Sequence, residues 1–128
     1  MVGLVIVSHS EKLAESVAEM ITVLAPGVPI APAGGMDDGG FGTSFEKIRQ
    51  AILGVLTEDG VVVLMDLGSA LMTAEMVIEM IGDSKVRMAD CPLVEGAVAA
   101  AIDSAGGMDL EAILKDLERV RGAKKIEM

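Results

Sequence analysis

The only histidine in the 128-residue chain, His9, follows an apolar run from Val2 to Val7. A short apolar run that stops at polar residues is typical of a buried strand that leads into a helix. Backbone N–H groups at a helix N-terminus favour an anion, so a phosphoryl group on this imidazole would be stabilised there. We therefore predict a functional His9, with a nucleophilic ring on which a phosphoryl group would be well stabilised. The alternative is a capping or solvent-facing histidine without a chemical role.

Asp66 is the second candidate, because it follows Val61–Met65, the clearest buried strand in the sequence. A carboxylate can accept a hydrogen bond from one nitrogen of an imidazole and leave the other nitrogen as the nucleophile. Its charge would also offset the positive charge that grows on the ring during phosphoryl transfer. The alternative is that Asp66 is only the N-cap of the next helix.

A glycine-rich segment from Gly34 to Gly42 predicts a loop, because it holds too many glycines for a helix or a strand. Its end can present backbone amides and hydroxyl groups to a phosphate at the start of the next helix. The spacing matches neither the Walker motif nor the dinucleotide fingerprint, and a flexible surface loop is the alternative. Ser69, three residues after Asp66, can add a hydroxyl at the same place. The predicted phosphate-binding residues are therefore Gly39, Gly42, Thr43, Ser44 and Ser69.

We expect structural roles for the single cysteine and for most of the methionines in the sequence. Cys91 has no second histidine to activate it, so we expect a small buried side chain. One Cys and one His provide no ligand set for a metal, and we predict neither a metal nor a cofactor. The methionines Met65, Met72, Met76 and Met80 recur at near-helical spacing; we predict that they belong to the core, with an exposed part as a possible docking surface.

Strands and helices are expected to alternate along one domain, residues 1–128. Thr43 and Glu46 have the spacing of a capping box, Asp109 can cap a last helix, and two prolines put the second strand at a sheet edge. This alternation predicts a doubly wound, mostly parallel α/β sheet of four to five strands with helices on both faces. After the opening strand, the expected strands are residues 28–33, 61–65 and 86–89, and the expected helices are residues 13–24, 43–55, 69–81, 94–105 and 110–120.

The topology determines where the candidate residues meet. Ligands in open parallel sheets bind beyond the carboxyl ends of the strands, where the strand order reverses. Segments 8–10, 34–44, 66–69 and 90–91 all follow expected strands. We therefore expect His9, Asp66 and the glycine-rich loop at one edge of the sheet.

Composition limits the partners. Ten basic and twenty acidic residues give a formal charge of −10, which makes nucleic acid an improbable partner and favours a basic or apolar protein surface. The N-terminus has no basic segment or cleavage site of a signal peptide, and its apolar run is too short to span a bilayer. The cytoplasm is the expected location.

Three motifs in order resemble the mannose-type enzyme IIA domains of the bacterial phosphotransferase system. They are residues 4–10 (LVIVSHS), the loop from Gly34 to Ser44, and residues 63–70 (VLMDLGSA), and the resemblance extends through residues 91–97 (CPLVEGA). It implies the mannose-type IIA fold and a phosphotransferase subunit that works through a phosphohistidine. His9 matches the phosphorylated histidine of the family, with phosphate on the Nε2 side, and Asp66 matches the aspartate that partners it.

The resemblance also implies partners, and it is strongest to the branch of the family that serves dihydroxyacetone kinase. In that branch phospho-HPr is the donor, ADP held on the DhaL subunit is the acceptor, and DhaK binds the dihydroxyacetone. Family members form homodimers. Some carry additional HPr-like and enzyme I-like domains, which this sequence lacks, so we expect separate donor proteins.

Three other functions remain open at the level of the sequence. The nearest is a mannose-type IIA component that serves a sugar permease. A receiver-like domain phosphorylated on Asp66 is more distant, because receivers need acidic metal ligands after the first strand, where this chain has Ser8-His9-Ser10. A ligand-binding module that uses the glycine-rich loop as a lid is the third.

Overall fold

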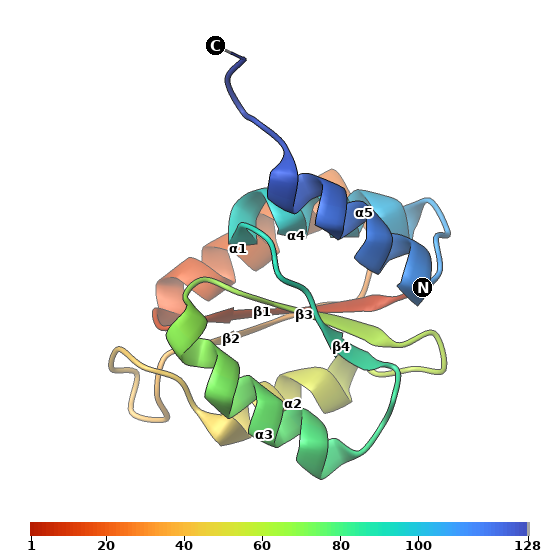
Figure 1. Ribbon diagram of the computed structural model, residues 1–128. Helices are drawn as coiled ribbons and strands as arrows, with labels where there is room; N and C mark the ends of the chain where they lie inside the picture. Colours follow the sequence, from red (N-terminus) through yellow and green to blue (C-terminus); the bar gives the residue numbers. More distant parts are fainter. Residues whose placement is uncertain (128) are drawn as a thin grey trace.

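The computed structural model describes residues 1–127 and shows one four-stranded parallel sheet with the strand order β2-β1-β3-β4 (Figure 1). This is the predicted doubly wound α/β architecture with the lower of the two predicted strand numbers. The elements are β1 (Gly3–Ser8), α1 (Glu11–Leu24), β2 (Ile30–Gly34), α2 (Phe45–Val55), β3 (Val61–Met65), the 3-10 turn η1 (Gly68–Ala70), α3 (Leu71–Ile81), β4 (Val86–Met88), α4 (Leu93–Ala105) and α5 (Leu110–Gly122).

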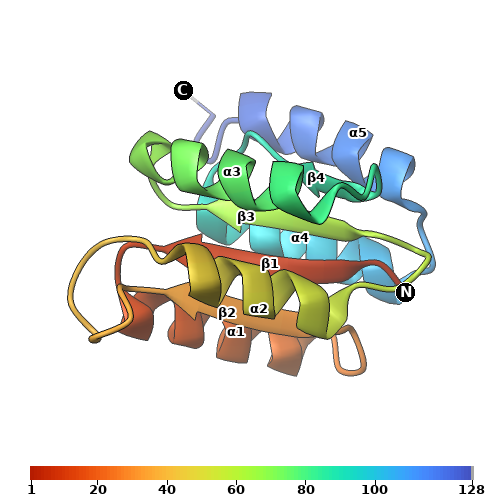
Figure 2. The ribbon, with the colours of Figure 1, turned by 90° about the horizontal axis from the view of Figure 1, so that it is seen from below.

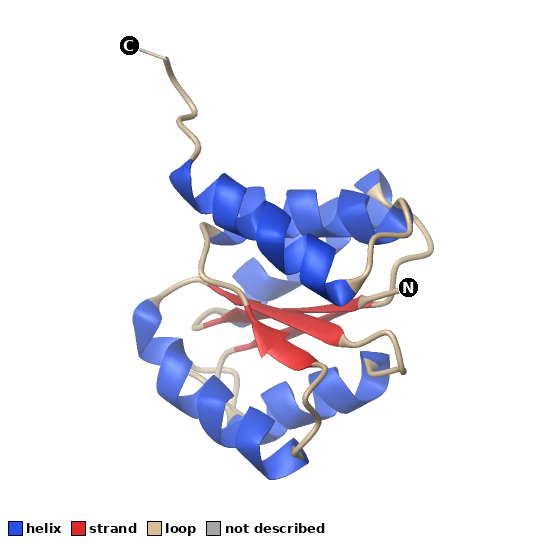
Figure 3. Cartoon of the chain, turned by 45° about the vertical axis from the view of Figure 1, so that its right-hand side comes forward, coloured by secondary structure: helices blue, strands red, loops and turns tan. Residues whose placement is uncertain are grey.

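Helices cover both faces of the sheet. Helices α1, α4 and α5 lie on one face and α2 and α3 on the other, so the sheet is the middle layer of three (Figure 3). Seen from the second face, α2 and α3 run across the sheet side by side (Figure 2). Within residues 1–127, no helix has the length and apolar character needed to cross a membrane.

The two central strands, β1 and β3, are apolar on both sides because both faces of the sheet are covered. Alternate side chains enter different cores, since successive residues of a strand point to opposite faces. The core under α1, α4 and α5 takes Leu4, Ile6, Val62 and Leu64. The core under α2 and α3 takes Val5, Val7, Val61 and Val63.

Short polar side chains start three of the helices. The Ser10 hydroxyl accepts a hydrogen bond from the Leu13 N–H at 3.2 Å, and Asp109 caps α5 as predicted. The capping box that we predicted from Thr43 and Glu46 is wrong by one residue, because Ser44 is the N-cap of α2 and accepts from the Lys47 N–H at 3.1 Å. Only Thr43 has a glutamate three residues later, and Ser44 caps the helix with Lys47 at that position, so the cap is a single side chain and not a capping box.

The end of β2 lies directly against the start of α1. A Cβ atom on Gly34 would lie 2.5 Å from the Ser10 carbonyl oxygen and 2.7 Å from the Ala14 Cβ, so a glycine is needed here. Strand β2 lies at the edge of the sheet, as its prolines predicted. This close approach fixes the first turn of α1, and therefore His9, against the sheet.

The methionine prediction is wrong for most of its members. Met72, Met76 and Met80 on α3 are 72%, 55% and 72% exposed, and only Met65 is partly buried. The inner face of α3 is formed by the buried residues Ala74 and Val77, with the partly buried Ile78 and Ile81 beside them. A helical period identifies a stripe of side chains without telling which way that stripe faces.

Candidate active site

His9 and Asp66 meet at the carboxyl edge of the two central strands. His9 directly follows β1, Asp66 directly follows β3, and the two strands are parallel neighbours. The Asp66 N–H extends the ladder by donating to the Val7 carbonyl oxygen at 3.1 Å. Because the chain passes from β2 across β1 to β3, this is the reversal point where the sequence predicted a site.

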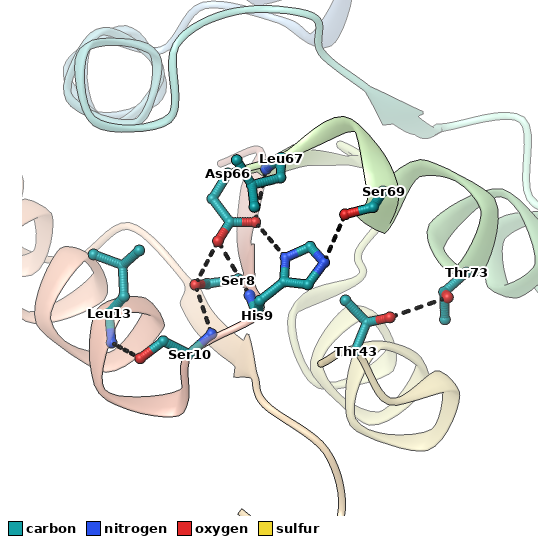
Figure 4. Close-up of polar contacts among 9 residues, drawn as sticks. All are labelled: Ser8, His9, Ser10, Leu13, Thr43, Asp66, Leu67, Ser69 and Thr73. Atoms are coloured by element: carbon teal, nitrogen blue, oxygen red, sulfur yellow. Dashed lines mark hydrogen bonds and ion pairs between the residues drawn. The ribbon is translucent and has the colours of Figure 1, made fainter. Parts of the chain in front are cut away.

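The Asp66 carboxylate accepts four hydrogen bonds (Figure 4). Its Oδ1 accepts from the His9 ring nitrogen Nδ1 at 3.0 Å and from the Leu67 N–H at 2.7 Å. Its Oδ2 accepts from the Ser8 hydroxyl at 2.9 Å and from the His9 N–H at 3.1 Å. Asp66 is therefore part of the His9 site and does not cap α3, which excludes the alternative role that the sequence left open.

These donors keep Asp66 ionised. Partial burial on its own raises the pKa of the Asp66 carboxyl, because it disfavours the charged form. Hydrogen bonds from the His9 backbone, the His9 ring, Ser8 and Leu67 act in the opposite direction and together outweigh it. The net result is a pKa below the usual aspartate value.

An ionised carboxylate can only accept hydrogen bonds, so it assigns the proton of a neutral His9 ring to Nδ1. The lone pair is then on Nε2, which lies 2.9 Å from the Ser69 hydroxyl on the far side of the ring (Figure 4). The His9 side chain is 23% exposed, and the Asp66 side chain is 14% exposed. The site thus presents one oriented nitrogen lone pair at the surface.

Ser8 is a site residue that was not predicted. Its side chain is fully buried, its hydroxyl donates to Asp66, and the same oxygen accepts from the Ser10 N–H at 3.0 Å. Ser8 thereby connects the carboxylate to the first turn of α1. Its position as the last residue of a strand beside His9 was the available signal.

The predicted phosphate-binding residues divide into two groups. Ser69 contacts the His9 ring, whereas Gly39, Gly42, Thr43 and Ser44 do not. The Gly42 N–H donates to the His9 carbonyl oxygen at 2.9 Å and the Gly39 N–H donates to the Met36 carbonyl oxygen at 2.9 Å.

Two hydroxyls near the end of this loop are also engaged. The Thr43 hydroxyl lies 3.1 Å from the Thr73 hydroxyl on α3, a partner that the sequence analysis missed. The Ser44 hydroxyl caps α2 and donates to Asp37 in a short hydrogen bond. Two of these groups therefore hold the shape of the loop, and the other two attach it to His9 and to α3.

A small pocket of about 370 Å³ opens between His9 and the loop, lined by residues 9–12 and 39–41. A larger pocket of about 660 Å³ lies at the amino ends of the strands, where Arg87 is paired with Glu111 at 2.8 Å and the N-terminus with Asp59 at 2.7 Å. Across residues 1–127, no group of three or more His, Cys, Asp or Glu side chains is arranged to hold a metal ion. Burial raises the pKa of Cys91 to about 11, so its thiol is unreactive at neutral pH.

The fold and the site together define a class of protein. It is a doubly wound α/β domain that holds one oriented imidazole at the point where the strand order of the sheet reverses. The family model described as "PTS system fructose IIA component", of the mannose type of enzyme IIA, matches residues 3–114. The chain belongs to this family of the phosphotransferase system.

Two relatives agree with this assignment. The chain is 39% identical to the "PEP-dependent dihydroxyacetone kinase, phosphoryl donor subunit DhaM" of Escherichia coli strain K12, over 100% of this chain and 29% of that protein. It is 36% identical to the "PEP-dependent dihydroxyacetone kinase 2, phosphoryl donor subunit DhaM" of Listeria innocua, over 94% of this chain and 99% of that protein. The chain thus spans less than a third of the E. coli protein and nearly all of the Listeria protein.

Solved structures agree on the fold. A protein of unknown function, EF1359, superposes with a TM-score of 0.82 at 31% identity and covers 98% of each chain. The "mannose/sorbose specific IIA subunit of phosphotransferase system" from Enterococcus faecalis superposes with a TM-score of 0.64 at 18% identity, over 99% of this chain and 96% of the other. The second likeness supports the architecture alone.

Proposed function

We propose that this chain is a phosphoryl carrier in which Nε2 of His9 receives a phosphoryl group from one protein and passes it to another. The observation that carries the proposal is the hydrogen bond of 3.0 Å between His9 Nδ1 and Asp66 Oδ1. It holds the ring proton on Nδ1 and leaves the Nε2 lone pair facing the surface.

The transfer needs no proton to move on His9. The donor is taken to be a protein that carries its phosphoryl group on a histidine nitrogen. The Nε2 lone pair of His9 attacks phosphorus, and the bond between phosphorus and that donor nitrogen breaks with its electron pair remaining on the donor. The product ring keeps its Nδ1 proton and becomes positive, and the Asp66 carboxylate stabilises that charge. The acceptor then attacks the same phosphorus, and the Nε2 electron pair returns to a neutral ring.

The phosphoryl group also needs contacts around its oxygens. We propose that the Ser69 hydroxyl, 2.9 Å from Nε2, turns from the ring to a phosphoryl oxygen. Gly39, Gly42 and Ser44 would contribute by shaping the loop beside the ring, because their N–H groups or hydroxyl are already bonded. Thr43 would act at the same rim once its hydroxyl leaves Thr73.

For the partners, we propose HPr as the donor, ADP on DhaL as the acceptor, and DhaK as the dihydroxyacetone-binding subunit of the same kinase. The names of the E. coli and Listeria relatives, which are phosphoryl donor subunits of dihydroxyacetone kinase, support this choice. Residues 1–128 would act as one IIA domain, as a homodimer in the cytoplasm.

The test is phosphoryl labelling of the protein with phosphoenolpyruvate, enzyme I and HPr. We expect the wild type to be labelled and His9→Ala to remain unlabelled, with a label that is stable in base and labile in acid. Equal labelling of His9→Ala would refute the proposal, and a base-labile label would indicate an acyl phosphate on Asp66.

The acceptor is then identified by separating the labelled protein from its donor and incubating it with each candidate acceptor. We expect the label to pass to DhaL charged with ADP and not to an enzyme IIB protein of a sugar permease. Transfer to the IIB protein instead would keep the carrier chemistry and refute the kinase assignment.

A further inference from the structure

Lys47 joins three elements at the base of the glycine-rich loop. Its Nζ donates to Oε2 of the Glu11 carboxylate at 3.0 Å and to the Gly34 carbonyl oxygen at 3.0 Å. Lys47 lies in the first turn of α2, Glu11 is the first residue of α1, and Gly34 is the last residue of β2. The Lys47 side chain is 29% exposed. One partly buried ammonium group therefore links two helices to the end of a strand.

The same residue is bonded to both ends of the loop. Residues 35–44 leave the sheet after Gly34 and return to it through α2 (Figure 2). The side chain of Lys47 binds Gly34 before the loop, and its backbone N–H donates to the Ser44 hydroxyl at the end of the loop, at 3.1 Å. Ser44 in turn donates to Asp37 inside the loop. Lys47 thus fixes where the loop begins and where it ends.

A lysine at this position is unfavourable for the helix itself. The N-terminus of a helix has a partial positive charge, so an acidic side chain is preferred in the first turn. Lys47 is three residues after the N-cap, where a capping box has a glutamate. A residue that breaks a local rule indicates a role that lies outside its own helix. The bonds of Lys47 to Glu11 and Gly34 account for the exception.

The loop is bonded to the peptide groups on both sides of His9. The Gly35 N–H donates to the Ser8 carbonyl oxygen at 3.1 Å, and the Gly42 N–H donates to the His9 carbonyl oxygen at 2.9 Å. The loop also lines the pocket beside the ring. A shift at the base of the loop would therefore move the two peptide groups that orient the imidazole.

We propose that Lys47 is a positioning residue for phosphoryl transfer, which acts by holding the glycine-rich loop against the main chain of His9. This inference rests on the proposed function. Transfer requires the Nε2 lone pair to point at phosphorus, and a misplacement of about 1 Å can lower the rate about 100-fold. Loss of the Lys47 contacts lowers the maximal rate. It leaves the half-saturating donor concentration nearly unchanged, because Lys47 acts on the position of the nucleophile and not by contact with the donor.

The first test compares Lys47→Met, Lys47→Arg and the control Arg49→Met in transfer from phospho-HPr. Methionine has nearly the length of lysine without its charge and its donors, whereas arginine keeps both. Arg49 lies on the same helix and is paired with the exposed Glu46 at 3.1 Å. We expect Lys47→Met to have an about 10-fold lower maximal rate and a half-saturating donor concentration within about 2-fold of wild type. Lys47→Arg should have a maximal rate within about 3-fold of wild type, and Arg49→Met should match wild type.

The second test measures the loop without any transfer. Hydrogen exchange of the Gly42 amide, followed by NMR, reports the bond to the His9 carbonyl oxygen, because exchange requires this bond to open. We expect the exchange to be about 10-fold faster in Lys47→Met and unchanged in Arg49→Met. The amide of Val5 in the central strand β1 should exchange at the wild-type rate in both variants.

Three results would overturn the inference. Wild-type exchange of Gly42 in Lys47→Met would show that Lys47 does not hold the loop. Faster exchange with an unchanged maximal rate would show that the loop does not position His9. An equal loss of rate in Arg49→Met would assign the effect to the charge or the stability of α2.

Glu11→Gln is the second variant, in case Lys47→Met does not fold. It removes the charged partner of Lys47 and leaves the bond to Gly34. We expect changes of about 3-fold in the same directions, in the Gly42 exchange and in the maximal rate, and wild-type values of either would overturn the inference. Failure of the proposed function is distinguishable, because the wild type itself would then remain unlabelled whatever the exchange of Gly42 shows.

Discussion

Two aspartates in this protein are both partly buried, and their pKa values are shifted in opposite directions. Asp66 accepts four hydrogen bonds, and its pKa lies below the usual value. Asp103 on α4 has a buried Oδ2 without a hydrogen-bond partner among the described residues. Burial, the hydrogen bond that Asp103 can donate to Asp116 only when it is protonated, and the charge of Asp116 raise the pKa of Asp103 to about 7. Arg119 offsets this only in part.

The difference shows that hydrogen-bond donors, more than burial, decide the charge of a carboxyl group here. Burial raises the pKa of both groups. Asp66 lies where the turns after two strands direct N–H groups and a hydroxyl at it, so it stays an anion. Asp103 faces another carboxyl group on α5 and keeps its proton to higher pH. The first arrangement places a negative charge beside the His9 ring, and the second makes the contact between two helices depend on pH.

The largest effect is expected from Asp66→Asn. An asparagine amide can donate to Nδ1, which favours the tautomer with the proton on Nε2 and removes the nucleophilic lone pair. We expect the rate of transfer from phospho-HPr to fall on the order of 10²- to 10⁴-fold, with an unchanged circular dichroism spectrum. The control is Asp38→Asn, the same change in the loop at the same edge. A wild-type rate in Asp66→Asn would contradict the role assigned to this carboxylate.

A smaller effect is expected from Ser8→Ala, which removes one of the four donors to Asp66. The pKa of Asp66 should rise, the transfer rate should fall about 10-fold, and the free energy of unfolding should fall by about 1–3 kcal/mol. Carboxyl chemical shifts, transfer kinetics and denaturant unfolding measure these changes.

Ser104→Ala is the matched control for this variant. Both serines are fully buried, and the Ser104 hydroxyl donates to the Val2 carbonyl oxygen at 2.6 Å, away from the site. It should lose similar stability and keep the wild-type transfer rate. Equal slowing of transfer in both variants would show that Ser8 acts only through stability.

Asp103→Asn should change the dependence of stability on pH. Aspartate in an unfolded chain ionises near pH 3.9, whereas Asp103 in the folded protein ionises near pH 7. Between these values the folded state holds more protons, so the free energy of unfolding of wild type falls as pH rises from about 4 to about 7.

The variant should lack this fall and be more stable than wild type at pH 8. We expect a gain on the order of 1 kcal/mol, because solvent screening reduces the effect of the full pKa shift. Urea unfolding between pH 4 and pH 8 measures it. Parallel pH profiles of the two proteins would contradict the raised pKa.

The smallest effect is expected from Asp116→Asn, a variant that separates the two main causes of the raised pKa of Asp103, burial and the neighbouring carboxylate. Asp116→Asn removes the neighbouring charge and leaves the burial, which is the largest cause of the raised pKa. The pKa of Asp103 should fall and yet remain above the usual aspartate value. Titration of the carboxyl carbons by NMR measures this, and a value unchanged near 7 would assign the whole shift to burial.

The fold and the central pair of residues were predictable because they depend on strong local patterns. The strands β1 and β3 are nearly continuous apolar runs, and parallel topology brings their carboxyl ends together. His9 and Asp66 follow these runs directly. Their contact required only that the two strands be neighbours.

Other features were not predictable, because they depend on long-range arrangement. Ser8 reaches Asp66 only because β1 pairs with β3 in the register that aligns Val7 with Met65. Asp103 and Asp116 meet through the packing of α4 on α5. The methionine stripe of α3 faces solvent because a second apolar stripe, which includes Ala74, Val77 and Ile78, takes the side of the helix toward the sheet.

The order of assembly during folding follows from the position of the site between β1 and β3. His9 and Asp66 are 57 residues apart, and α1, β2 and α2 lie between them in the chain. Contacts of large sequence separation have a higher loop-closure cost than local contacts, so we expect this pair to form after the local helical turns. A partly folded chain therefore has the imidazole without the carboxylate that fixes its tautomer. If His9 carries phosphate as proposed, efficient transfer requires β1 and β3 to be paired, and a donor would charge folded molecules much faster than partly folded ones.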